Sequence, residues 1–163
     1  MLFQNLIGHS PNFETMLRSA RMVAMTDVTV LIIGETGTGK ELMAKALQAS
    51  SPRADKPFVT INCSALPESL AESELFGHKK GSFTGANSNQ VGKLQAAHGG
   101  TVFLDEIDSL PITIQAKILR FLETGEIQPV GESSAQNVNV RVIAATNAKL
   151  QEQIDRGEFR KDL

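Results

Sequence analysis

A run of glycines followed by a lysine is the first pattern in this chain whose spacing could do chemistry. The segment GETGTGKE, residues 34–41, stands between a short apolar run and a helical pattern. Glycines let the backbone curl so that successive N–H groups face an anion, and the amino end of the following helix adds a favourable dipole. The spacing G-x-x-x-x-G-K is that of a phosphate-binding loop, in which Lys40 reaches the β- and γ-phosphates of a nucleotide. We therefore predict binding of ATP by one set of loop residues: Gly34, Glu35, Thr36, Gly37, Thr38, Gly39, Lys40 and Glu41.

Glu41 departs from the usual pattern, because most phosphate-binding loops carry Ser or Thr after the lysine to ligate Mg²⁺. Either Mg²⁺ is held mainly by another acidic site, or Glu41 contributes through a water molecule, and the sequence leaves both options open. The alternative to the whole motif is a glycine turn that only joins a strand to a helix. We disfavour it because three fixed positions rarely coincide by chance behind a strand.

Two carboxylates end a later apolar run, TVFLDE at residues 101–106. Beside a bound nucleotide they would divide the work: Asp105 would organise the Mg²⁺ shell, and Glu106 would polarise the water that attacks the γ-phosphate. Asn147 ends another run, VRVIAATN, where it could sense the γ-phosphate by hydrogen bonding. The ordinary alternatives are a solvated strand end for the carboxylates and a turn-forming cap for Asn147. Because a phosphate-binding loop is present, a catalytic role is favoured for the acidic pair. For Asn147, sensing of the γ-phosphate and capping of a turn both stay open.

Short apolar runs rich in β-branched residues predict the strands that must hold these groups, at residues 28–33, 57–62, 101–106 and 140–147. Helical spacing fills intervals between them, at residues 40–50, 67–76 and 111–123. This alternation predicts an α/β domain whose parallel sheet is covered by helices on both faces. Two insertions break the rhythm. Residues 77–92, rich in glycine, predict an exposed and mobile loop, and residues 124–139 predict a β-hairpin.

The composition limits what kind of protein this is. A length of 163 residues with 41% hydrophobic residues suits one compact domain, and a net charge of −2 gives no electrostatic footprint for direct DNA binding. Cys63 is the single cysteine, so no internal disulfide can form, and three scattered histidines make no metal site. Neither a signal-peptide pattern nor a membrane-length apolar run is present, so we expect a cytoplasmic protein with no membrane partner.

Several motifs in fixed order resemble one protein family from end to end. They are GETGTGKE, NCSALPESL, ESELFGHKKGSFTGA, GGTVFLDEID, LRFLE and VRVIAATN. In this order they resemble the AAA+ domain of bacterial sigma-54-dependent transcriptional activators, the NtrC-like enhancer-binding proteins. The most specific is GSFTGA, residues 81–86, which is similar to the GAFTGA loop that contacts sigma-54 in the polymerase holoenzyme. The resemblance implies that residues 1–163 form the α/β subdomain of an AAA+ P-loop NTPase.

The GSFTGA segment carries the implied partner contact. Phe83 and Thr84 would be the tip residues that engage sigma-54, and a phenylalanine exposed among glycines would suit gripping a partner better than folding. A disordered loop is the alternative without the resemblance. Ser82 replaces the family's usual Ala, which is a small-for-small change. The partner-binding residues implied by the resemblance are Gly81, Ser82, Phe83, Thr84, Gly85 and Ala86.

The resemblance implies further site residues. Asn62 matches the position that pairs with the catalytic Glu and relays the state of the γ-phosphate toward the loop, and Asn147 matches sensor I. Arg160, in GEFRKDL, matches one of an Arg pair supplied across the subunit interface. Glu41 is what this family usually carries after the lysine. We also assign Ile7 and Gly8 to nucleotide binding.

The family forms rings, typically hexamers, with ATP between neighbours, and hydrolysis moves the loop. The helical lid and the principal arginine finger lie beyond this chain, so we expect the chain alone to bind nucleotide and hydrolyse it poorly. DNA binding would come from a domain not in this chain.

Three alternative functions are less consistent with the sequence. Another AAA+ enzyme would have no reason to contain GSFTGA. A nucleotide-sensing scaffold would need a damaged catalytic set, and a factor acting only through DNA contacts is disfavoured by the charge.

Overall fold

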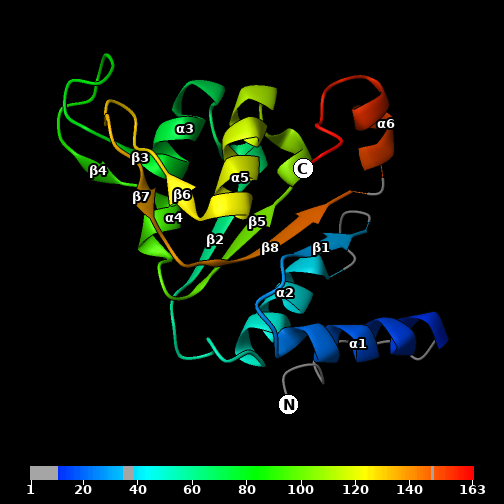
Figure 1. The fold of residues 1–163 in the computed structure, drawn as a ribbon. Coiled ribbons are helices and arrows are strands. Elements are labelled where there is room, and N and C mark those ends of the chain that lie inside the picture. The colour runs from blue at the N-terminus through cyan, green and yellow to red at the C-terminus, as the bar shows by residue number, and fades with distance from the viewer. Residues whose placement is uncertain (1–10, 35–38, 148) are drawn as a thin grey trace.

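A four-stranded parallel sheet forms the centre of the computed structural model, which describes residues 11–34, 39–147 and 149–163. Its strands are β1 (Val30–Ile33), β2 (Phe58–Asn62), β5 (Thr101–Asp105) and β8 (Arg141–Thr146). They lie in the order β1-β8-β5-β2, so the strand that carries the acidic pair stands beside β8 and β2 (Figure 1). All four predicted strands are therefore confirmed, each within two residues at either end. The parallel order confirms the α/β fold.

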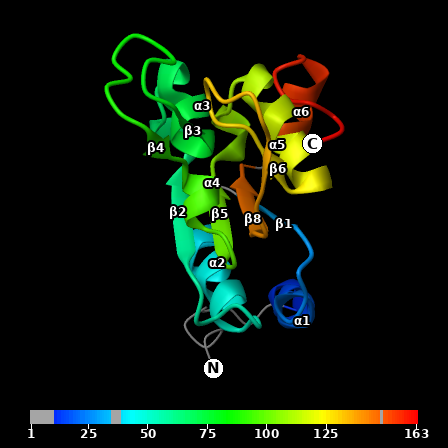
Figure 2. The ribbon, with the colours of Figure 1, turned by 60° about the vertical axis from the view of Figure 1, so that its left-hand side comes forward.

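Helices cover both faces of this sheet. α1 (Pro11–Ala24) and α2 (Lys40–Ala49) lie on one face (Figures 1 and 2). The opposite face carries α3 (Glu68–Phe76), α4 (Lys93–Ala96), α5 (Ile112–Thr124) and α6 (Leu150–Asp155). The buried residues of β5 alternate between two apolar clusters: Phe103 packs with the α1 and α2 side, and Val102 and Leu104 pack with the other. Burial on both faces explains why the strands read as unbroken apolar runs.

α1 was not predicted from the sequence, and a buried arginine fixes its end to the sheet. The side chain of Arg141 is 1% exposed. Its guanidinium donates hydrogen bonds to the carbonyl oxygens of Ala24 (3.0 Å) and Val23 (2.7 Å) in the last turn of the helix. These are carbonyl groups that a helix end leaves without partners inside the helix, and a cation is favourable there.

We predict that Arg141→Lys lowers the free energy of unfolding by about 2 kcal/mol, because one ammonium cannot reproduce the forked contacts of a buried guanidinium. Urea unfolding of the whole chain measures this. Arg120→Lys is the matched control, since Arg120 lies on the surface and pairs with Glu126. Equal losses for both variants would show that the Arg141 contacts do not hold α1.

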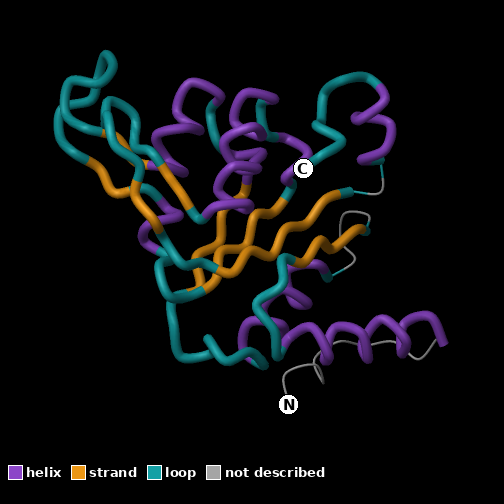
Figure 3. Tube along the Cα trace, viewed as in Figure 1, coloured by secondary structure: helices purple, strands orange, loops and turns teal. Residues whose placement is uncertain are grey.

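The two insertions lie side by side (Figures 1 and 3). In the first, β3 (Gly77–His78) pairs antiparallel with β4 (Gln90–Val91), and in the second, β6 (Glu126–Ile127) pairs antiparallel with β7 (Gln136–Asn137). The second pair confirms the predicted hairpin. A β-bridge joins His78 to Val130, and the Lys79 N–H donates to the Val130 carbonyl oxygen at 2.9 Å. The segment predicted as an exposed loop is therefore anchored at its base to the hairpin.

Two 3₁₀ turns follow the strand ends, η2 (Cys63–Ala65) after β2 and η3 (Ile107–Ser109) after β5. Within the described ranges, no helix has the length and apolar character needed to cross a membrane.

Candidate functional site

Lys40 stands at the first turn of α2 and links two strand ends. Its Nζ donates to the carbonyl oxygen of Gly34 at 2.6 Å, just past β1, and to that of Thr146 at 3.2 Å, at the end of β8. The preceding Gly39 has φ of +82°, a conformation that favours glycine. The lysine of the predicted loop is thus held beyond the carboxyl ends of the strands, where open α/β sheets bind ligands. Predicted nucleotide contacts at Ile7, Gly8 and residues 35–38 lie outside the described residues.

Asp105 ends β5 and is followed by the strained Glu106. In the described part of the chain, Glu106 is the one residue other than glycine with positive φ, at +53°. Its N–H donates to Asp105 Oδ1 at 2.9 Å. Such conformations cost about 1–3 kcal/mol and gather at functional sites. The backbone therefore changes direction at Glu106, between the end of β5 and the η3 turn.

Burial raises the pKa of Asp105 above its ordinary value, and the negative charges of Glu106 and Glu41 act in the same direction. The Glu106 N–H and the Lys40 ammonium oppose this and lower the pKa. Asp105 is thus a carboxylate whose charged form lacks full compensation from the protein. A bound cation would supply that compensation.

Asp108 is a site residue that the sequence analysis missed. It lies in η3 and accepts hydrogen bonds from Asn147 Nδ2 at 2.9 Å and from Thr146 Oγ1 at 3.1 Å. Asn147 also uses its Oδ1 to accept from the Lys149 N–H at 2.8 Å. The side chain of Asn147 therefore acts as a turn cap and as a link from β8 to the segment after the acidic pair. The signal for Asp108 was its place two residues after Glu106 in DEID.

Asn62 lies opposite Asp105 in the register of β2 and β5. Its side-chain oxygen accepts from the Ser64 N–H at 3.1 Å and from the Ser64 hydroxyl at 2.8 Å, which caps η2. Among the described residues Asn62 makes no hydrogen bond to Glu106, so the pairing of these two residues stays a prediction. The structure brings Asn62 to the same strand ends as the acidic pair.

Cys63, beside Asn62, is buried at the edge of this acidic region. Burial, with the charges of Asp105, Asp108 and Glu106, raises the pKa of its thiol to about 12. A thiol with such a pKa stays protonated at neutral pH and is a poor nucleophile. Cys63 therefore takes a packing role.

Arg160 does not reach these strand ends within the chain. Its guanidinium pairs with Asp162 at 2.9 and 2.7 Å, and its backbone N–H donates to Gln115 Oε1 at 2.8 Å. The neighbouring Phe159 is buried in the core. The structure therefore fixes the backbone of the GEFRKDL segment while the guanidinium lies at the surface, and its role across a subunit interface stays a prediction.

The GSFTGA segment differs from its expected form. Thr84 is exposed as predicted, but Phe83 is half-buried, with its ring edge-on to that of His78 at a centroid distance of 4.9 Å. Ala86 is buried as well. The expectation of an exposed phenylalanine is therefore wrong for this structure, because a neighbouring imidazole covers part of its ring.

A parallel α/β sheet that holds a loop lysine and an acidic pair at its carboxyl ends defines the class, a P-loop NTPase domain. Comparison with known protein families gives the particular family. The family described as the Sigma-54 interaction domain matches residues 6–163, and the chain belongs to it. The resemblance inferred from the sequence is thereby confirmed.

Relatives of known name agree with this family. The chain is 56% identical over 158 residues to the anaerobic nitric oxide reductase transcription regulators NorR of Escherichia fergusonii and Citrobacter koseri. The match covers 97% of this chain and 31% of each regulator, so the chain spans about a third of their length.

Solved structures agree with the fold. Crystal structures of NtrX from Brucella abortus match with a TM-score of 0.86 at 36% identity, over 99% of this chain and 36% of NtrX. NtrX in complex with ATP matches with a TM-score of 0.84 at 38% identity, over 96% of this chain and 35% of NtrX. The P-loop NTPase domain of an E. coli sigma-54 activator matches at 20% identity with a TM-score of 0.62, over 96% of this chain and 89% of that domain, which supports the fold alone.

Proposed function

We propose that this domain hydrolyses ATP with Mg²⁺ and thereby remodels RNA polymerase that carries sigma-54, which activates transcription from sigma-54-dependent promoters. The observation that carries the proposal is the placement of Lys40 and the Asp105–Glu106 pair at the carboxyl ends of neighbouring strands. The family match and the NtrX complex with ATP support it.

Lys40 would bind the β- and γ-phosphates. Its ammonium now contacts two backbone carbonyl oxygens, those of Gly34 and Thr146. Phosphate oxygens carry more negative charge than carbonyl oxygens, so charge-assisted contacts with them are the stronger ones. The rest of the predicted loop, with Ile7 and Gly8, would surround the nucleotide.

Asp105 fits the role of protein ligand to Mg²⁺, directly or through water. Its charged form is disfavoured by burial and by neighbouring carboxylates, which a cation would relieve. Mg²⁺ is usually held by one or two carboxylates together with substrate phosphates. When bound, Mg²⁺ would neutralise charge that develops on the phosphoryl oxygens.

Glu106 would act on the attacking water. Glu106 follows the last residue of β5 and has a left-handed backbone, so it stands just outside the strand that Asp105 ends. It would accept the proton of the water as a general base. Asn147, held by Asp108, would sense the γ-phosphate, and Asn62 would relay its presence toward the loop.

The segment Gly81–Ala86 would contact sigma-54, with Phe83 and Thr84 at its tip. Copies of the domain would assemble into a ring, typically a hexamer, in which Arg160 of one copy approaches the nucleotide of the next. An arginine supplied in this way can raise the rate by roughly 10³ to 10⁵. A separate domain would bind DNA.

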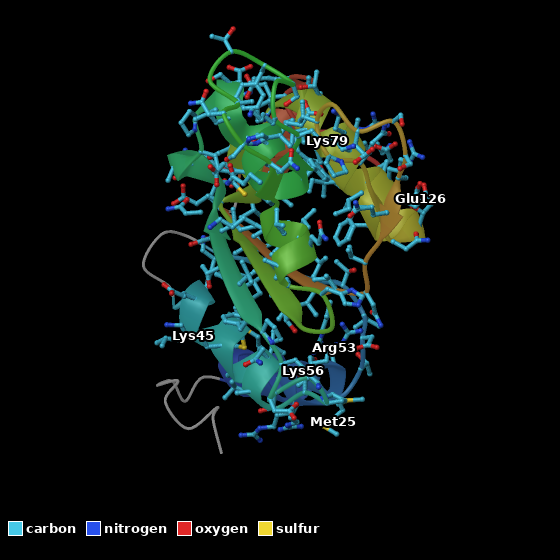
Figure 4. The ribbon with its side chains drawn as sticks, turned by 90° about the vertical axis from the view of Figure 1, so that its left-hand side faces the viewer. Met25, Lys45, Arg53, Lys56, Lys79 and Glu126 are labelled. Carbon is cyan, nitrogen blue, oxygen red and sulfur yellow. The ribbon has the colours of Figure 1, made fainter. Side chains whose placement is uncertain are left out.

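We predict that Lys40→Ala weakens ATP binding roughly 10- to 100-fold, because it removes a charge-assisted contact. Titration with a fluorescent ATP analogue measures this. Lys56→Ala is the control, since Lys56 is an exposed lysine outside the predicted nucleotide site (Figure 4). Equal affinities for the Lys40 variant and the unmodified chain would contradict the assigned nucleotide site.

A further inference from the structure

The GSFTGA segment has a defined local fold. The Ala86 N–H donates to the Phe83 carbonyl oxygen at 3.1 Å, and the Gly81 N–H donates to the Ala86 carbonyl oxygen at 2.8 Å. These bonds close a tight turn around Phe83, and Ala86 lies under it at 6% exposure. The position of the Phe83 ring is therefore set by what the turn packs against.

His78 is the ring that Phe83 packs against. The two ring centroids are 4.9 Å apart with an interplanar angle of 72°, which is an edge-to-face contact. Contacts of this kind add a small favourable free energy beyond that of the area they bury. That is enough to favour one position of an otherwise solvent-facing turn, and small enough for a binding partner to overcome.

His78 is itself fixed from two sides. Its Nδ1 hydrogen bonds with the hydroxyl of Ser73, which lies on α3, and the imidazole is 8% exposed. Its backbone pairs with Gln90 in β4 and is bridged to Val130 in the hairpin. The place of Phe83 thus depends on both α3 and the β6–β7 hairpin.

The hairpin makes two further contacts with the segment. Lys79 pairs with Glu132 at 2.9 Å (Lys79 is labelled in Figure 4). A Cβ atom placed on Gly131 would lie 2.6 Å from Cβ of Ser82, so the hairpin and the GSFTGA segment are in close contact there. Because Gly131 has φ of +83°, glycine suits this position on both counts.

We infer that His78 is a positioning residue that, anchored by Ser73, holds Phe83 in a withdrawn position, and that release of this ring contact presents Phe83 to sigma-54. The inference rests on the proposed function for the identity of the partner. The withdrawn position itself rests only on the contacts among Ser73, His78 and Phe83.

The anchor of His78 has a physical route to the nucleotide site. Asn62 caps η2, and Cys63 of that turn belongs to the same apolar cluster as Ala71 and Leu75 of α3. α3 also carries Ser73. A change at the end of β2 that shifts α3 would therefore move the anchor of His78.

A single tryptophan tests the position of Phe83, because the chain contains no natural tryptophan. In a Phe83→Trp background, acrylamide quenching reports how far the indole is shielded. Ser73→Ala and His78→Ala should each raise the quenching constant, by roughly twofold, since a ring contact that is lost exposes one side of the indole. His78→Phe retains a ring at the position and should restore most of the shielding.

His98→Ala is the matched control, because His98 is exposed and lies away from the segment, bonded to the Asn139 N–H. Ser73→Ala keeps the inference testable if His78→Ala fails to fold. Quenching constants that are the same in Ser73→Ala, His78→Ala and His98→Ala would overturn the inference.

Binding to sigma-54 holoenzyme is the second readout. It is measured on the chain extended by a helical lid, with the natural Phe83 and without the tryptophan substitution. With His78→Ala, binding without nucleotide should rise toward the level seen with a transition-state mimic of ATP hydrolysis. A merely structural role would lower binding in both conditions, and that result would overturn the inference. If no variant binds sigma-54 while the quenching differences persist, the proposed partner is wrong and the positioning role of His78 stands.

Discussion

Replacing Glu106 with Gln should lower the rate of ATP hydrolysis about 10²- to 10⁴-fold, the usual contribution of a positioned general base. The amide has nearly the same shape and cannot accept the proton of the attacking water. ATP affinity should change little, because Lys40 and not Glu106 is the proposed contact to the phosphates. The variant should therefore retain bound ATP.

Steady-state phosphate release and nucleotide titration, carried out on the chain extended by a helical lid, separate these two effects. Glu123→Gln is the control, since Glu123 is an exposed carboxylate on α5. An unchanged turnover number for the Glu106 variant would show that another group activates the water.

Replacing Asp105 with Asn should lower the rate of hydrolysis by at least about 10²-fold, because the proposed protein ligand to Mg²⁺ would lose its charge. The same change should raise the melting temperature of the chain at neutral pH. The pKa of Asp105 is higher in the folded chain than its ordinary value, with burial as the largest cause. The folded state therefore binds the proton more tightly than the unfolded state, and the ionised carboxylate destabilises the fold.

The sign of this effect sets its pH dependence. Stability is lost as pH rises from the unfolded pKa through the raised folded pKa, and the loss is complete above it. The melting temperatures of Asp105→Asn and the unmodified chain should therefore converge at acidic pH and separate at neutral pH. Asp55→Asn, at an exposed position, is the control. A variant that melts lower than the unmodified chain at pH 7 would contradict the unfavourable environment of Asp105.

Much of the fold could be predicted because its physical causes are local. The strands are buried on both faces, so each appears as a continuous apolar run, and turn residues mark the hairpin at residues 124–139. α1 was missed although it packs against α2 through small and medium apolar residues. What places it is the contact of Arg141 with its last turn, which joins residues far apart in sequence.

In the candidate site, too, residues in short local patterns could be predicted, and residues placed by contacts between distant segments could not. Lys40, Asp105 and Glu106 follow from a glycine loop and an acidic strand end, which are short patterns. Asp108 stands two residues after Glu106, but its role depends on η3, which turns it back toward β8, where it meets Thr146 and Asn147. A three-dimensional contact of this kind leaves no periodic trace in the sequence.

The partial burial of Phe83 could not be predicted for a similar reason. The glycines around it indicate an irregular segment, but they do not indicate what the segment packs against. The covering ring, His78, is five residues away, and its orientation is set by Ser73 on α3. Sequence reasoning therefore expected more exposure of Phe83 than the structure shows.

We propose that nucleotide controls the binding of this domain to sigma-54. The direct measurement is binding of sigma-54 holoenzyme to the chain extended by a helical lid, with and without a transition-state mimic of ATP hydrolysis. We predict binding with the mimic that is lost in Phe83→Ala and Thr84→Ala and retained in Ser88→Ala, an exposed position in the same insertion. Nucleotide binding without any contact to sigma-54 would contradict the claim.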